Sequence, residues 1–130
     1  MTPDTIARWH AVVARRDLAA LDALLDPAVV FISPVVHAPQ AGRALTRAYL
    51  GAALQVLGNA GFRYLGEWRA PDSAVLEFET EVDGIRINGV DMIRWGADGR
   101  IVEFKVMVRP LKAINLLHQK MAAALAGAQQ

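Results

Sequence analysis

The stretch VDMIRWGADGRIV, residues 90–102, has the pattern of two β-strands joined by a tight turn. Side chains on a strand alternate between two faces, and Asp91 here alternates in step with Ile93 and Trp95. The turn residues Ala97-Asp98-Gly99 separate the two strands. The stretch therefore predicts a hairpin whose apolar face carries one carboxyl group, that of Asp91.

Outward from this hairpin, the apolar residues recur at helical spacing in the first half of the chain and at alternate positions in the second half. Four helices are expected. The first starts at Thr2-Pro3, and the second is capped by Asp17 and ends at Asp26-Pro27. The third covers residues 43–57, and the last follows Pro110 with an apolar stripe of Leu111, Ile114, Leu117 and Met121. The expected strands cover residues 29–32, 62–69, 74–83, 85–95 and 101–109.

This order of elements predicts an α+β fold in which helices cover one face of a largely antiparallel sheet. The chain of 130 residues is expected to form a single domain over residues 1–130, with a frayed tail at 127–130. Its hydrophobic content of 54% exceeds what a disordered chain carries, and it favours an extra buried surface such as a cavity or a subunit interface.

Composition excludes several classes of function. The absence of cysteine excludes disulfides and thiol chemistry, and the three histidines lack the spacing of metal ligands, so no metal or cofactor is expected. Fourteen basic and thirteen acidic residues nearly cancel, which gives no reason to expect nucleic acid or a membrane surface as partner. We expect a cytoplasmic protein, because no apolar run is long enough to span a bilayer.

The opposite face of the sheet carries charges in an ordered pattern. Glu77, Glu79 and Glu81 alternate with apolar residues on one predicted strand, and neighbouring strands offer arginines as partners. Such a face is either a solvated surface laced by cross-strand ion pairs or a polar dimer interface. The sequence leaves both interpretations open.

Asp91 is the residue on which a chemical role depends. An ionised carboxylate on an apolar face needs partners, and without them its pKa rises and it keeps a proton. A neutral buried carboxylic acid can donate a hydrogen bond to a ligand oxygen. The alternative is a structural aspartate that bonds to the backbone, and a bulge near Gly89 would turn the side chain outward.

The same stretch, VDMIRWGADGRIV, resembles a hairpin of the nuclear transport factor two-like, or SnoaL-like, superfamily, which includes ketosteroid isomerase. The resemblance extends over the order of elements from about residue 6 to residue 109. It implies a cone-shaped, curved, mixed or antiparallel sheet wrapped by N-terminal helices, with a C-terminal helix and an apolar cavity. It also implies that Asp91 stands where that family has its oxyanion-hole aspartic acid.

Two positions depart from the isomerase pattern. Ser33 stands where the isomerase has its catalytic aspartate, and a neutral hydroxyl is not a general base near neutral pH. Trp9 stands where the isomerase has a tyrosine, and an indole N–H donates one hydrogen bond without transferring a proton. His37, in the loop after Ser33, is the candidate replacement for the missing base.

The resemblance implies a pocket for a small, apolar, oxygen-bearing ligand, with acid–base isomerisation, cyclisation or hydration as the chemistry of any turnover. Asp91, Ser33 and His37 are the candidate catalytic residues. The candidate ligand-binding residues are Trp9, Phe31, Tyr49, Phe78, Trp95, Phe104 and Val106. The alternative is a non-catalytic dimeric binding or scaffolding domain with a closed pocket, and under either interpretation a homodimer through the outer sheet face is expected.

Overall fold

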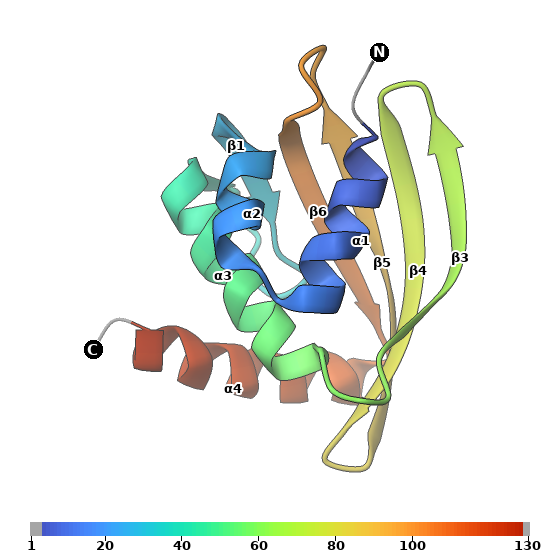
Figure 1. Cartoon of the computed structure of the whole chain (residues 1–130). Coiled ribbons are helices and arrows are strands. Elements are labelled where there is room, and N and C mark those ends of the chain that lie inside the picture. Colours follow the sequence, from blue (N-terminus) through green and yellow to red (C-terminus); the bar gives the residue numbers. More distant parts are fainter. Residues whose placement is uncertain (1–3, 129–130) are drawn as a thin grey trace.

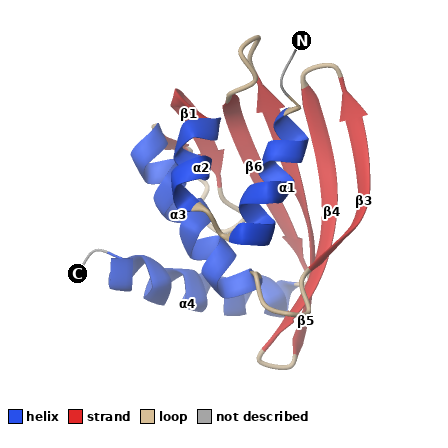
Figure 2. Ribbon diagram, in the orientation of Figure 1, coloured by secondary structure: helices blue, strands red, loops and turns tan. Residues whose placement is uncertain are grey.

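The computed structural model describes residues 4–128, which form one six-stranded sheet and the helices that pack on it. In chain order the elements are α1 Thr5–Arg15, α2 Leu18–Leu24, β1 Leu25–Ile32, β2 Gln40–Ala41, α3 Arg43–Leu57, β3 Arg63–Ala70, β4 Ser73–Val82, β5 Ile85–Trp95, β6 Ile101–Arg109 and α4 Leu111–Ala128. Helices α1, α2 and α3 lie against one face of the curved sheet, and α4 packs against α3, β5 and β6 (Figures 1 and 2). The predicted α+β class is confirmed.

The strand order is β2-β1-β6-β5-β4-β3, with β1 and β6 parallel and all other neighbours antiparallel. The β4–β5 pairing runs without a register shift, so Gly89 forms no bulge. Asp91 is opposite Leu76 on β4 and opposite Val106 on β6. Since directly opposed residues share a face, Asp91 points toward the helices, as the alternation predicts.

The start of β1 differs from the prediction. The predicted helix end at Asp26-Pro27 is wrong, because α2 ends at Leu24 and Leu25 already pairs with Ile101 in the sheet. The pairing is irregular from there to Val30, and this interval contains Pro27. A proline has no N–H for a regular ladder, so an irregular stretch of strand tolerates it.

The two ends of the chain also refine the prediction. The expected helix start at Thr2-Pro3 lies outside the described residues, and Asp4 caps α1 by accepting a hydrogen bond of 3.0 Å from the Ala7 amide. Of the expected tail, residues 127 and 128 belong to α4, and 129–130 lie outside the described residues. Within residues 4–128, no helix is long and apolar enough to cross a membrane.

The buried stripe of α4 is displaced from the expected one. Leu111 is 73% exposed, which contradicts its predicted place on that stripe. Ala113 and Leu117 are buried instead, and Met121 packs against the same core. These three residues are four apart and share one helix face, whereas Leu111 lies in the first turn on another face.

The outer sheet face carries the expected ion pairs. Glu79 contacts Arg86 at 2.7 Å and Arg63 at 3.7 Å. Arg94 contacts Glu103 on the next strand at 3.3 Å. The arginine partners are largely exposed, so each pair stabilises the sheet by no more than about 1 kcal/mol.

Candidate functional site

Asp91 is one of four buried polar residues among the described ones, and its side chain lies in the core between sheet and helices. Only 6% of its surface is exposed. Its strand neighbours on the same face, Gly89 and Ile93, are buried as well. The position of Asp91 follows from the pairing of β5 with both of its neighbours, which is regular from Asn88 to Arg94.

A chain of hydrogen bonds holds this carboxyl group in place. The hydroxyl of Tyr64, on β3, donates to Asp91 Oδ2 at 2.6 Å. The indole N–H of Trp9, on α1, donates to the Tyr64 hydroxyl oxygen at 2.9 Å. Within residues 4–128, Asp91 Oδ1 makes no side-chain hydrogen bond, so this oxygen is available to a ligand.

Burial decides the protonation state of this group. It raises the pKa of Asp91 from 3.8 to about 7, against a smaller opposing effect of the hydrogen bond from Tyr64. Burial, and then the neighbouring Asp91, raises the pKa of the Tyr64 hydroxyl well above its usual value. At neutral pH Tyr64 therefore keeps its proton, and Asp91 is protonated in a large share of the protein molecules.

A small inner cavity of about 50 Å³ lies beside Asp91. Its wall is apolar apart from Asp91, Tyr64 and Trp9, and Trp9 packs edge-to-face on Phe104 with ring centroids 4.8 Å apart. The cavity has few polar groups, and one of them is a carboxyl group whose pKa lies near neutral pH. It is therefore suited to bind an otherwise apolar molecule through one oxygen atom.

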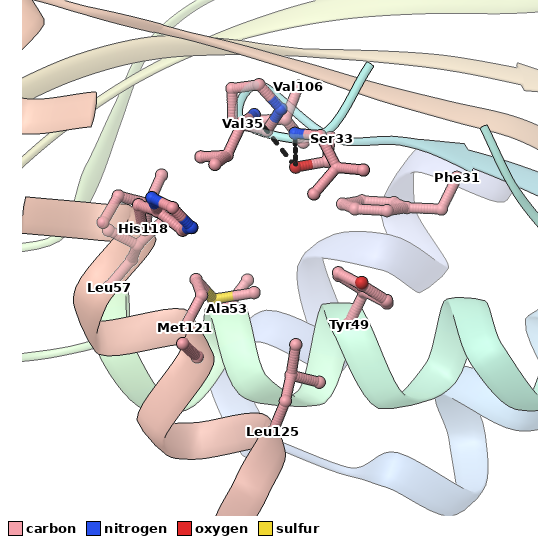
Figure 3. A pocket seen from close by; sticks show the side chains of 14 residues that line it. Phe31, Ser33, Val35, Tyr49, Ala53, Leu57, Val106, His118, Met121 and Leu125 are labelled. Atoms are coloured by element: carbon pink, nitrogen blue, oxygen red, sulfur yellow. Dashed lines mark hydrogen bonds between the residues drawn. The ribbon is translucent and has the colours of Figure 1, made fainter. Parts of the chain in front are cut away.

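A larger outer cavity of about 210 Å³ lies between the loop after β1 and the helices α3 and α4. Figure 3 shows Phe31, Tyr49, His118 and Met121 around it. The Ser33 hydroxyl oxygen, also on this wall, accepts hydrogen bonds from the amides of the next turn, at 3.0 Å from Val35 and 3.3 Å from Val36 (Figure 3).

The two cavities divide the predicted site residues. The inner cavity is lined by Asp91, Trp9, Phe78 and Phe104, the outer one by Ser33, Phe31 and Tyr49, and both by Val106. Two predicted residues line neither of these cavities: His37 is exposed in its loop, and Trp95 packs at the edge of the core.

Two residues of the site were not found by sequence reasoning. Tyr64 is visible in the sequence only as an aromatic residue on a predicted apolar strand face, and its partner Asp91 lies two strands away. The β3–β4 register shifts between Tyr64 and Gly66, which a pattern of alternation does not reveal. His118 is exposed, as expected for its polar neighbours on α4, yet it lines the outer cavity that contains Ser33.

Comparison with solved structures shows that other proteins share this fold, among them the following three. A steroid delta-isomerase from Pseudomonas aeruginosa matches with a TM-score of 0.90 and 41% identity, over 96% of this chain and 91% of that chain. A protein with a cystatin-like fold from Silicibacter pomeroyi matches with a TM-score of 0.85 and 35% identity, over 92% and 84%. A protein with a ketosteroid isomerase-like fold from Catenulispora acidiphila, in complex with trimethylamine, shares the fold at 16% identity over 88% and 91%, with a TM-score of 0.63.

The search of curated proteins gives no match. The SnoaL-like domain family, in contrast, matches residues 6–104, which include nearly all of α1, the whole of β5 with Asp91, and the first part of β6. The predicted superfamily is thus confirmed, and the chain belongs to the SnoaL-like family.

Proposed function

We propose that this protein binds a small, apolar ligand through one oxygen atom, and that protonated Asp91 donates the hydrogen bond that holds it. The supporting observation is the arrangement of the carboxyl group: Tyr64 occupies Oδ2, while Oδ1 is unpaired within the described residues and Asp91 lines the inner cavity. With Tyr64 donating to one oxygen, the proton of the neutral acid lies on the other. Such a donor in an apolar site favours a ligand carbonyl oxygen, above all one that gains negative charge.

Any turnover at this site would be acid–base chemistry of the isomerase, cyclase or hydratase type. The 41% identity to a steroid delta-isomerase supports this class. A proton acceptor is the missing part, because Ser33 offers a neutral hydroxyl whose oxygen already accepts two amide hydrogen bonds. Binding is therefore the function that the geometry supports best, and catalysis is the second part of the proposal.

Binding of methyl butyl ketone, a linear methyl ketone, measured across pH tests this proposal. In the wild type the affinity should fall about 30-fold between pH 6 and pH 8.5, because only the protonated fraction of Asp91 can donate to the ketone. In Asp91→Asn the amide NH₂ donates at every pH, so the affinity should stay constant. Calorimetric titration of both proteins, with hexane as a linear apolar ligand that accepts no hydrogen bond, gives the comparison. A wild-type affinity that is the same at both pH values would contradict the role of Asp91.

We also propose that the protein forms a homodimer through the outer sheet face, which helices leave uncovered (Figure 1). Two exposed apolar residues, Trp68 at 60% and Met107 at 52%, lie on this face. The register places other apolar residues beside them, namely Val75, Val90 and Met92. An apolar centre with ion pairs around it is the common anatomy of an interface, and it fits the alternative of a non-catalytic dimeric domain equally well.

The substitution Met107→Lys should convert the dimer to a monomer, because it buries a charge at the centre of the interface. Leu111→Lys is the matched control, since Leu111 is exposed on α4, away from the sheet face. Sedimentation equilibrium of the three proteins measures the mass. A wild type that sediments as a monomer, or a Met107→Lys protein that remains dimeric, would rule out this interface.

A further inference from the structure

The inner and outer cavities are adjacent and share part of their lining. Three residues line both cavities: Ala53 and Leu57 from α3, and Val106 from β6. Val106 is directly opposite Asp91 in the β5–β6 register, so the two side chains are neighbours on the inner sheet face. The wall beside the Asp91 carboxyl group is therefore a valine side chain that also faces the outer cavity.

The two compartments differ in size and in chemistry. The inner one, about 50 Å³, has room for about three water-sized groups, and so for the polar head of a ligand but not for its body. The outer one is about 210 Å³, and three of its lining side chains are polar: Ser33, Tyr49 and His118. A ligand larger than a few heavy atoms extends beyond the first compartment, and the second one is adjacent to it.

One side of the outer compartment lies beyond the matched family residues. The SnoaL-like match ends at residue 104, whereas Val106 and the α4 wall follow it. From α4 come His118 and four apolar residues, namely Leu117, Met121, Ala122 and Leu125. The C-terminal helix thus adds an apolar compartment next to the site that contains Asp91.

We propose that the two cavities bind one molecule, with its carbonyl head beside Asp91 and an unbranched hydrocarbon tail that passes Val106 into the outer compartment. The ligand class is that of carbonyl compounds with a linear apolar tail of several carbons. Val106, Ala53 and Leu57 select for tail shape, because only a narrow chain passes between them. The inference rests on the proposed function, since Asp91 holds the head.

A series of linear methyl ketones from butanone to nonanone, titrated by calorimetry near pH 6, tests this inference. In the wild type each added methylene should tighten binding about fourfold, as expected for burial of one CH₂ group. Ala53→Leu narrows the passage, so this gain in affinity with chain length should disappear. Ala44→Leu, the same change at an exposed position of α3, should leave the gain intact.

Val106→Ala should act in the opposite direction by widening the passage. The wild type should bind methyl butyl ketone about tenfold more tightly than its branched isomer methyl isobutyl ketone, and Val106→Ala should reduce this preference to about twofold. Val102→Ala, the same deletion on the same strand but outside both cavity linings, should keep the preference.

The results of these titrations distinguish a failure of this inference from a failure of the proposed function. A chain-length gain that Ala53→Leu leaves unchanged overturns the two-compartment ligand, even where binding still weakens as pH rises. A gain that Ala53→Leu abolishes, in a protein whose ketone affinity does not depend on pH, supports the passage and overturns the role of Asp91. The absence of saturable binding for every ketone overturns both.

Discussion

Relative to Asp91→Asn, the wild-type protein should lose about 4 kcal/mol of stability as the pH rises from 4 to 7.5. The folded protein holds the Asp91 proton up to a pKa of about 7, whereas the unfolded chain releases it near 3.8. Between these values the native state binds more protons than the unfolded state, so its free energy of unfolding falls with rising pH. Well below pH 3.8 both states are protonated, and the difference in free energy of unfolding between the two proteins should no longer change with pH.

The comparison with Asp91→Asn isolates this effect from other titrating groups. The pKa values of Asp4, Glu67 and Asp98 are lowered in the folded protein, chiefly by hydrogen bonds to backbone or side-chain donors, and they add stability as the pH rises through their range. These groups are common to both proteins and cancel in the difference. Urea denaturation at half-unit pH intervals measures it, with Asp72→Asn in an exposed turn as the control. A constant difference between wild type and Asp91→Asn would contradict a raised Asp91 pKa.

The substitution Gly89→Ala should destabilise the protein by about 3 kcal/mol. Gly89 is opposite Phe78, and an added Cβ would lie 2.6 Å from the Phe78 ring and 2.5 Å from the Met107 carbonyl oxygen. Neither group can yield easily, because the backbone oxygen is fixed in the sheet and the Phe78 ring, 1% exposed, stacks on Phe62. Since Phe78 lines the inner cavity, a displaced ring would also reduce the space beside Asp91.

Gly96→Ala is the matched control for this prediction. A Cβ at Gly96 would meet its nearest neighbours at 3.7 and 3.8 Å, which is ordinary van der Waals contact. We expect it to change stability by less than about 0.5 kcal/mol in the same urea titration. A Gly89→Ala protein as stable as Gly96→Ala would mean that the Phe78 ring does not lie over Gly89.

The strands β4, β5 and β6 could be predicted because their apolar residues alternate with period two. The expected bounds of β5 and β6 agree with the structure, and the alternation places Asp91 on the inner face. The start of β1 could not be predicted, because Asp26-Pro27 reads as the end of a helix, and only the irregular pairing with β6 accommodates this proline in a strand. The two-residue strand β2 is too short to leave a pattern.

The sequence predicted the central residue of the site, Asp91, but not the residues that surround it. A carboxyl group on an apolar face is visible in the sequence, but its donor Tyr64 depends on a register shift in β3. The separation into two cavities depends on how α4 packs on α3, which is a property of tertiary packing. For the same reason the sequence favoured His37, close to Ser33 along the chain, whereas the histidine that shares a cavity with Ser33 is His118.

The central claim is that a carboxyl group in this core keeps its proton at nearly neutral pH. Infrared titration of the Asp91 carboxyl band, assigned by its loss in Asp91→Asn, measures this directly. We predict a midpoint near pH 7 and a still higher one in Tyr64→Phe, which removes the hydrogen bond that favours the ionised form. A band that disappears near pH 4, as for an aspartate in water, would contradict the account.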